Sequence, residues 1–242
     1  MKPIFSLILG LGLLVGCAVK HPETPTGFIE KEIETKYLSF AVWEKVASSN
    51  QPMRIYIEGD GTPAPQRPYA LEMAVKDTTP NVIYIARPCQ YVSCKECRNP
   101  ALWLTERYND ELVQEMRQLI LYLMNKYQPS KLDLVGYDGG GTMALLLAPR
   151  LPVNKVITVG GILNTHDYME KNNLPPVSGE NPADNRNRLA RIPQEHYVGE
   201  KDTLATRKMA ERFVARLNNP VSAVVKVVPG ATHTKWEHLI IE

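Results

Sequence analysis

Short apolar runs alternate with amphipathic segments along most of the chain. The clearest amphipathic segment covers residues 105–127, where Leu112, Met116 and Leu119 recur on one helical face and Pro129 follows. Strands separated by helices predict an α/β fold, with a mostly parallel sheet covered by helices on both faces. The other expected elements are helices at residues 140–147 and 206–217 and strands near residues 37–43, 54–57, 81–86, 131–135, 155–159, 195–198 and 223–228.

The first residues have the pattern of an export signal. Lys2 gives a basic start, and residues 4–16 form an apolar and glycine-rich stretch that ends at Cys17. This stretch matches the ~7–15-residue apolar region of a secretory signal and is short for a membrane span. The final Leu-Val-Gly-Cys resembles a bacterial lipobox, which implies a lipidated Cys17 and cleavage before it.

The lipobox sets the expected domain organisation. We expect a signal peptide at residues 1–16, a lipidated Cys17 with a polar tether through residue 36, and one folded domain at residues 37–242. Acyl chains on Cys17 would hold the protein on a membrane. Ala18 stands where an Asp would suggest inner-membrane retention, so by its resemblance to known lipoprotein sorting the chain is expected at the outer membrane.

Composition narrows the function classes. The chain has 242 residues, of which 44% are apolar and 22% charged, and its formal net charge is +2. The apolar content excludes disorder as the main state. The balanced charge disfavours a nucleic-acid partner, and no apolar run reaches the ~18 residues that a spanning helix needs.

Three further cysteines, Cys89, Cys94 and Cys97, follow the pattern C-x₄-C-x₂-C. An iron–sulfur cluster would need a fourth cysteine, and the remaining one, Cys17, is assigned to lipid. Cys94 and Cys97 could form half of a zinc site or a redox pair, but no second pair completes it, so no metal is expected. In an exported protein a disulfide is the simpler expectation, and we predict Cys89–Cys97 with Cys94 left over.

The segment Gly136-Tyr137-Asp138-Gly139-Gly140 follows a predicted strand and opens a helix. It matches the strand–turn–helix of the G-x-S-x-G nucleophile elbow, with Asp138 in place of serine. A phosphate-binding loop is disfavoured, because no Lys-Ser/Thr follows the glycines and no dinucleotide fingerprint fits.

The rest of a catalytic triad follows in the chain order of α/β-hydrolases. Asp202 follows a strand and would orient the base, with Glu200 as the alternative acid, and His233 would be the base. The turn at Asp60 and Gly61, after residues 54–57, is placed to supply one oxyanion-hole amide. The second would be the amide of Gly139. No cofactor is needed for acyl transfer.

Six motifs together resemble a family of bacterial α/β-hydrolase-fold lipoproteins. The resemblance implies an α/β-hydrolase fold, hydrolysis of ester-like bonds and a small ester-like ligand. It departs at Asp138, where the family carries serine. The motifs are YIEGDG (56–61), ARPCQY (86–91), LVGY-x-GGG (134–141), NPAD (181–184), VGEKD (198–202) and VPGATH (228–233).

Three accounts of Asp138 stay open. Its carboxylate could be the nucleophile, as in dehalogenases and epoxide hydrolases, but those enzymes usually carry Trp at the next position, where this chain has Gly139. The chain could be a non-catalytic binding lipoprotein whose carboxylate fills the oxyanion hole. Alternatively, Asp138 is an inactivating substitution in an otherwise complete hydrolase. The last two accounts predict little or no turnover.

Overall fold

The computed structural model describes residues 21–61, 65, 67–237 and 239–241. The predicted signal peptide and Cys17 lie outside these residues. Within the described part, no helix is long and apolar enough to cross a membrane.

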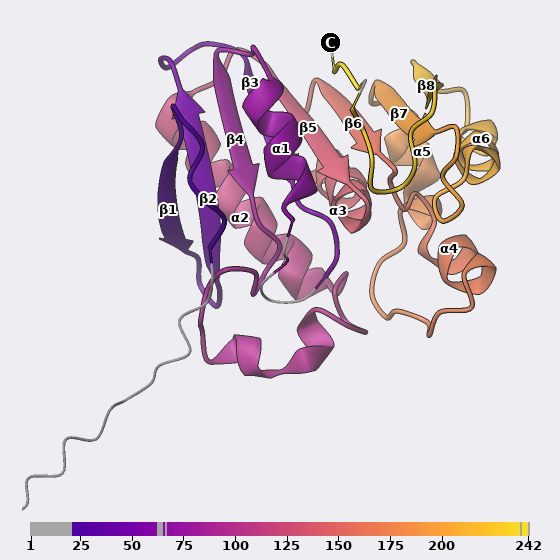
Figure 1. Ribbon diagram of the computed structural model, residues 1–242, viewed down its shortest axis with the longest axis horizontal. Helices are drawn as coiled ribbons and strands as arrows, with labels where there is room; N and C mark the ends of the chain where they lie inside the picture. Colours follow the sequence, from indigo (N-terminus) through magenta and orange to yellow (C-terminus); the bar gives the residue numbers. More distant parts are fainter. Residues whose placement is uncertain (1–20, 62–64, 66, 238, 242) are drawn as a thin grey trace, which may run out of the picture.

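One eight-stranded sheet forms the centre of the molecule, in the order β1-β2-β4-β3-β5-β6-β7-β8 (Figure 1). Strand β2 pairs antiparallel with β1 and β4, and the other neighbours are parallel. The α/β-hydrolase fold predicted from the sequence is therefore confirmed. The strands are β1 (Ile29–Glu34), β2 (Ser39–Val46), β3 (Met53–Ile57), β4 (Asn81–Ile85), β5 (Leu132–Tyr137), β6 (Lys155–Val159), β7 (Gln194–Gly199) and β8 (Ala223–Val228).

The two faces of the sheet are covered unequally. One core lies under α2, α3, α5 and α6, and the other lies under α1 and the C-terminal residues Trp236, Leu239 and Ile241. Figure 1 shows α1 on one side of the sheet and α2 and α3 on the other. The helices are α1 (Tyr69–Lys76), α2 (Asp110–Tyr127), α3 (Gly139–Leu147), α4 (Thr165–Lys171), α5 (Arg186–Leu189) and α6 (Arg207–Ala215).

Strand β1 lies inside the segment that was expected to be a tether. Four of its six residues are charged, and it pairs along its length with β2. An edge strand needs one apolar face only, so its polar composition is compatible with the sheet. Residues 29–34 therefore belong to the folded domain, which begins before the predicted boundary at residue 37.

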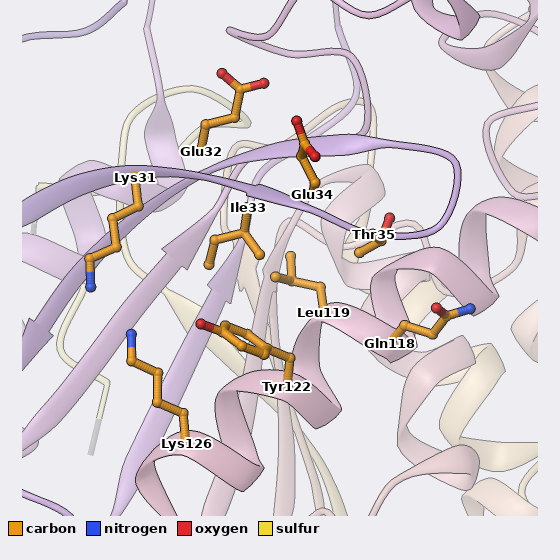
Figure 2. A pocket seen from close by; sticks show the side chains of 9 residues that line it. All are labelled: Lys31, Glu32, Ile33, Glu34, Thr35, Gln118, Leu119, Tyr122 and Lys126. Atoms are coloured by element: carbon orange, nitrogen blue, oxygen red, sulfur yellow. The ribbon is translucent and has the colours of Figure 1, made fainter.

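A cavity of about 720 Å³ opens between β1 and α2. Figure 2 shows Ile33, Leu119 and Tyr122 turned toward one another across it, while Glu32 and Glu34 point away. Its lining residues come from β1, from Thr35 directly after it and from α2, and they include none of the predicted catalytic residues. The candidate site lies instead where β3, β5, β7 and β8 end, as expected for ligands of open α/β sheets.

Candidate active site

Asp138 occupies a sharp turn between β5 and α3. Its backbone has φ 49° and ψ −120°, a strained conformation for a non-glycine residue. A Cβ on Gly136 would lie 2.2 Å from the Gly140 carbonyl oxygen, and one on Gly140 would lie 2.2 Å from the Ile57 carbonyl oxygen. The turn therefore requires both glycines, as a nucleophile elbow does.

The structure brings the three predicted triad positions together. His233 Nδ1 lies 2.9 Å from Asp202 Oδ2, and His233 Nε2 lies 3.2 Å from Asp138 Oδ1. The carboxylate of Asp202 also accepts hydrogen bonds from the backbone N–H groups of Leu204 and Ala205, at 2.8 and 3.0 Å. The imidazole thus lies between two carboxylates.

Glu200, the alternative acid, is exposed and lies outside this chain of contacts. Its carboxylate accepts the backbone N–H of Gly230 at 2.8 Å and stabilises the loop that leads to His233. The geometry therefore favours Asp202 as the acid of the triad.

Two aromatic residues fix the His233 loop. The Tyr137 hydroxyl donates to the His233 carbonyl oxygen at 2.9 Å, and the Trp236 indole N–H donates to the same oxygen at 2.8 Å. The Tyr137 ring also lies beside the imidazole, with centroids 5.7 Å apart. These two contacts could not be predicted from the sequence, because a hydrogen bond to a backbone carbonyl leaves no pattern in it.

The two carboxylates change the protonation of His233. Burial alone would lower its pKa, but hydrogen bonds to Asp138 and Asp202, together with their charges, outweigh burial and raise the pKa to about 10. His233 is therefore an imidazolium at neutral pH. A protonated imidazole cannot accept the proton of an attacking group, so it is not available as a general base.

The turn after β3 supplies one of the predicted oxyanion-hole amides. The backbone N–H of Asp60 points at Asp138 Oδ2, 3.2 Å away, and Gly61 lies next along the turn beside Gln90. Gly139, at the start of α3, packs against the turn so closely that a Cβ there would lie 2.1 Å from Asp60 Cγ. The Asp138 carboxylate thus already accepts a hydrogen bond from this turn.

A second acid, Glu58, stabilises the same turn from within. Its fully buried carboxyl accepts the N–H of Gly59 at 2.8 Å, the N–H of Ala70 at 3.1 Å and the hydroxyl of Tyr84 at 3.1 Å. Burial raises its pKa, those hydrogen bonds oppose the rise, and the net pKa is about 7. Glu58 links the turn to the N-terminus of α1.

Three residues that the sequence does not mark as functional surround the Asp60 side chain. Arg87 Nη1 lies 2.7 Å from Asp60 Oδ1, Arg107 Nε lies 2.8 Å from Asp60 Oδ2, and the Tyr108 hydroxyl donates to that second oxygen. Arg87 was quoted as part of a motif. Arg107 and Tyr108 lie in a loop before α2, although the sequence predicted a helix that already begins at residue 105.

The three cysteines cluster at the start of the loop after β4. Cys97 Sγ lies within disulfide-bonding contact of both Cys89 and Cys94. One sulfur forms a single disulfide, so the arrangement supports a bond to Cys97 and leaves its partner open between the two. All three sulfur atoms lie within 4.8 Å of one another.

Solved structures with this architecture include several hydrolases. Est1E from Butyrivibrio proteoclasticus has a TM-score of 0.62 and 11% identity, over 86% of this chain and 91% of its own. An esterase from Pyrococcus furiosus has a TM-score of 0.62 and 12% identity, over 85% of this chain and 82% of its own. An α/β serine hydrolase homologue from Coxiella burnetii has a TM-score of 0.59 and 15% identity, over 85% of this chain and 89% of its own. At these identities the likeness establishes the fold alone.

No curated protein sequence matches the chain. The model of the dienelactone hydrolase family matches residues 94–237, which are more than half of the chain and include the elbow, Asp202 and His233. The chain therefore belongs to the dienelactone hydrolase family.

Proposed function

We propose that this protein is a lipid-anchored hydrolase relative whose site, with Asp138 at the nucleophile position, is held in an inactive ion-paired state. Its inherited chemistry is hydrolysis of an ester-like bond, a class that includes the cyclic esters in the family's name. The observation that carries the proposal is the contact of His233 Nε2 with the Asp138 carboxylate, 3.2 Å away.

The Asp138 carboxylate removes two requirements of acyl transfer, each through a different contact. The base is protonated, because the charge of Asp138 adds to that of Asp202 in raising the pKa of His233 to about 10. The N–H of Asp60 is also directed at the Asp138 carboxylate instead of at a substrate oxygen. Attack by a carboxylate on an ester would in addition give a mixed anhydride, with no clear gain over the ester.

The test is Asp138→Ser, assayed on 4-nitrophenyl acetate. Serine restores a nucleophile and removes one of the two charges that protonate His233. Triad members act as a unit, so restoring one could raise the rate by ~10⁴-fold or more. Asp138→Asn removes the same charge without supplying a nucleophile and should stay inactive. The double variant Asp138→Ser/His233→Ala should lose the gain.

The outcomes separate the accounts of Asp138. A parent chain that hydrolyses the ester as fast as Asp138→Ser contradicts the proposal. Turnover of a haloalkane or epoxide by the parent, with oxygen from ¹⁸O-labelled water first found in Asp138, would establish the carboxylate-nucleophile account instead. A folded Asp138→Ser that stays inert on a broad ester panel would favour a binding protein.

The lipid anchor has a separate test. It is supported by the Leu14-Val15-Gly16-Cys17 sequence, and attachment through Cys17 is expected at the outer membrane. A metabolic fatty-acid probe should label the full chain and should not label Cys17→Ser. Equal labelling of both would contradict the anchor.

A further inference from the structure

The three cysteines after β4 are placed so that either of two disulfides can form. The Cα atoms of Cys89 and Cys97 are 5.2 Å apart, and those of Cys94 and Cys97 are also 5.2 Å apart. Both separations lie within the range of ~4.4–6.8 Å that disulfides span. All three sulfur atoms lie within 4.8 Å of one another. The backbone of this segment therefore fits both bonds, and Cys97 can change its partner without a rearrangement of the chain.

The two possible partners of Cys97 differ in burial. Cys89 is 1% exposed and packs within the core that α2 and α3 cover, whereas Cys94 is half-buried at the edge of that core. The backbone N–H of Cys97 donates to Cys94 Sγ at 3.3 Å, which keeps this sulfur beside Cys97. Thiol–disulfide exchange begins with a thiolate that has access to a disulfide sulfur. Solvent can remove a proton from Cys94, so Cys94 is the sulfur that attacks a Cys89–Cys97 bond.

We propose that Cys89, Cys94 and Cys97 form a thiol–disulfide exchange site, in which one disulfide moves between a buried and an accessible partner. Starting from the Cys89–Cys97 bond, Cys94 loses its proton to solvent and its thiolate attacks Cys97 Sγ. The Cys94–Cys97 bond forms, the Cys89–Cys97 bond breaks, and Cys89 leaves with the electron pair and takes up a proton. One disulfide and one thiol are present before and after the step, so it needs no oxidant or reductant.

The two disulfides constrain different parts of the chain. Cys89 lies between Arg87 and Gln90, and the Gln90 side chain accepts the Arg87 N–H at 3.0 Å. A Cys89–Cys97 bond joins this segment to the loop that follows it, whereas a Cys94–Cys97 bond closes a ring within the loop alone. Moving the bond to Cys94 therefore releases the segment around Arg87 from the cross-link. The exchange uses no residue of the triad, so it does not depend on the proposed function.

The first experiment determines which thiol is free. The full chain is purified without reductant, quenched in acid, unfolded, and labelled with N-ethylmaleimide at acidic pH, where exchange is slow because thiolate is scarce. Trypsin cleaves after Lys95, so both disulfides join the same two peptides, and fragment-ion spectra show whether Cys89 or Cys94 carries the label. Cys17 lies on a separate peptide. We expect label on both Cys89 and Cys94 in one sample. Label confined to one of them, or on Cys97 as well, would overturn the inference.

The second experiment tests whether the two disulfide isomers interconvert. Iodoacetamide added to the folded chain reaches the half-buried Cys94 thiol and not the buried Cys89 thiol. With exchange, each molecule passes through the state in which Cys94 is free, so label on Cys94 should rise to about nine-tenths of the protein or more. Without exchange, labelling stops at the fraction in which Cys94 was free at the start. A plateau at that starting fraction would overturn the inference.

Two alanine variants fix one disulfide each. Cys94→Ala retains the Cys89–Cys97 bond, and Cys89→Ala retains the Cys94–Cys97 bond. By NMR, the Arg87 N–H should exchange with deuterium roughly tenfold faster in Cys89→Ala than in Cys94→Ala, because the cross-link beside it is absent. Val92→Ala is the matched control, because it truncates a buried side chain in the same segment and leaves all three sulfur atoms in place. Equal exchange in the two cysteine variants would overturn the release of this segment.

Discussion

The two acids that contact His233 are held in different ways. Asp202 has a fully buried side chain, and its carboxylate accepts the backbone N–H groups of Leu204 and Ala205 in addition to His233 Nδ1. Asp138 stands on a strained backbone turn, and its contacts to Asp60 N and to His233 Nε2 are both 3.2 Å long. The Asp202 side chain is hydrogen-bonded to its own loop, whereas the Asp138 side chain is positioned by the conformation of its backbone turn.

This comparison shows which residues the fold of the site requires and which residues determine its reaction. The elbow forms because Gly136 and Gly140 allow close backbone approach, whatever side chain stands at residue 138. Asp202 in contrast supplies acceptors to two N–H groups of its own loop, so replacing it changes structure and chemistry together. A substitution at residue 138 can thus change the reaction while the fold persists.

The largest expected effect comes from removing the Asp202 charge in an active background. In Asp138→Ser, Asp202→Asn should lower kcat by ~10⁴-fold, because an amide favours the wrong imidazole tautomer and does not stabilise its cation. Kinetics on 4-nitrophenyl acetate would measure this. Glu200→Gln is the control and should leave kcat unchanged. If Glu200→Gln is the more damaging change, the acid of the triad is misassigned.

The sequence predicted the strands and the triad positions of this site because each of them is marked by a short, continuous segment of the chain. Strands β6 and β8 were placed at their observed bounds, since strands in a parallel sheet appear as continuous apolar runs. The elbow, the acid and the histidine each follow a strand within a short motif. Strand β1 was missed because four of its six residues are charged, and the short helices α1, α4 and α5 were missed because so few turns give no clear period.

The surroundings of Asp60 could not be predicted in the same way. Arg87 lies 27 residues from Asp60 and Tyr108 lies 48 residues away, and the contacts exist only once two separate loops fold over the turn. The loop that carries Tyr108 was expected to be part of the helix at residues 105–127, so its side chains were not placed beside Asp60. The protonation of His233 was missed for the same reason, because it depends on the short distance between Asp138 and the imidazole.

A backbone change at the elbow should have the next largest effect. Gly140→Ala puts a Cβ 2.2 Å from the Ile57 carbonyl oxygen, where only backbone atoms could move away, so we expect the free energy of unfolding to fall by ~3 kcal/mol or more. Urea unfolding would measure the change. Gly230→Ala is the contrasting control, because Gly230 has a positive φ of 69° but no atom within 4 Å of the added Cβ, whereas Gly140 lies in α3 without a positive φ. A loss in Gly230→Ala as large as that in Gly140→Ala would show that close approach at the elbow costs no more than a strained backbone.

The smallest effect is a change in how stability depends on pH. The pKa of His233 is about 10 in the folded chain and 6.5 unperturbed, so its contribution to stability is fully present below pH ~6.5 and is lost as pH rises through ~10. One group contributes at most ~1.4 kcal/mol per pH unit in this window. Glu58 also loses its contribution as pH rises, but between 4.5 and about 7, so measurements from pH 7.5 to 10 separate the two groups.

Asp138→Asn isolates the part of this dependence that belongs to the elbow. It removes the Asp138 charge, so the pKa of His233 falls, and less stability should be lost between pH 7.5 and 10 than in the parent chain. Urea unfolding at several pH values measures the difference, and Asp167→Asn, which alters an ion pair with exposed Arg212, should leave the parent slope unchanged. Identical slopes for Asp138→Asn and the parent would show that Asp202 alone holds the proton on His233. Asp138 would then have no effect on the pKa of His233, and the inactivity of the site would follow from the missing serine alone.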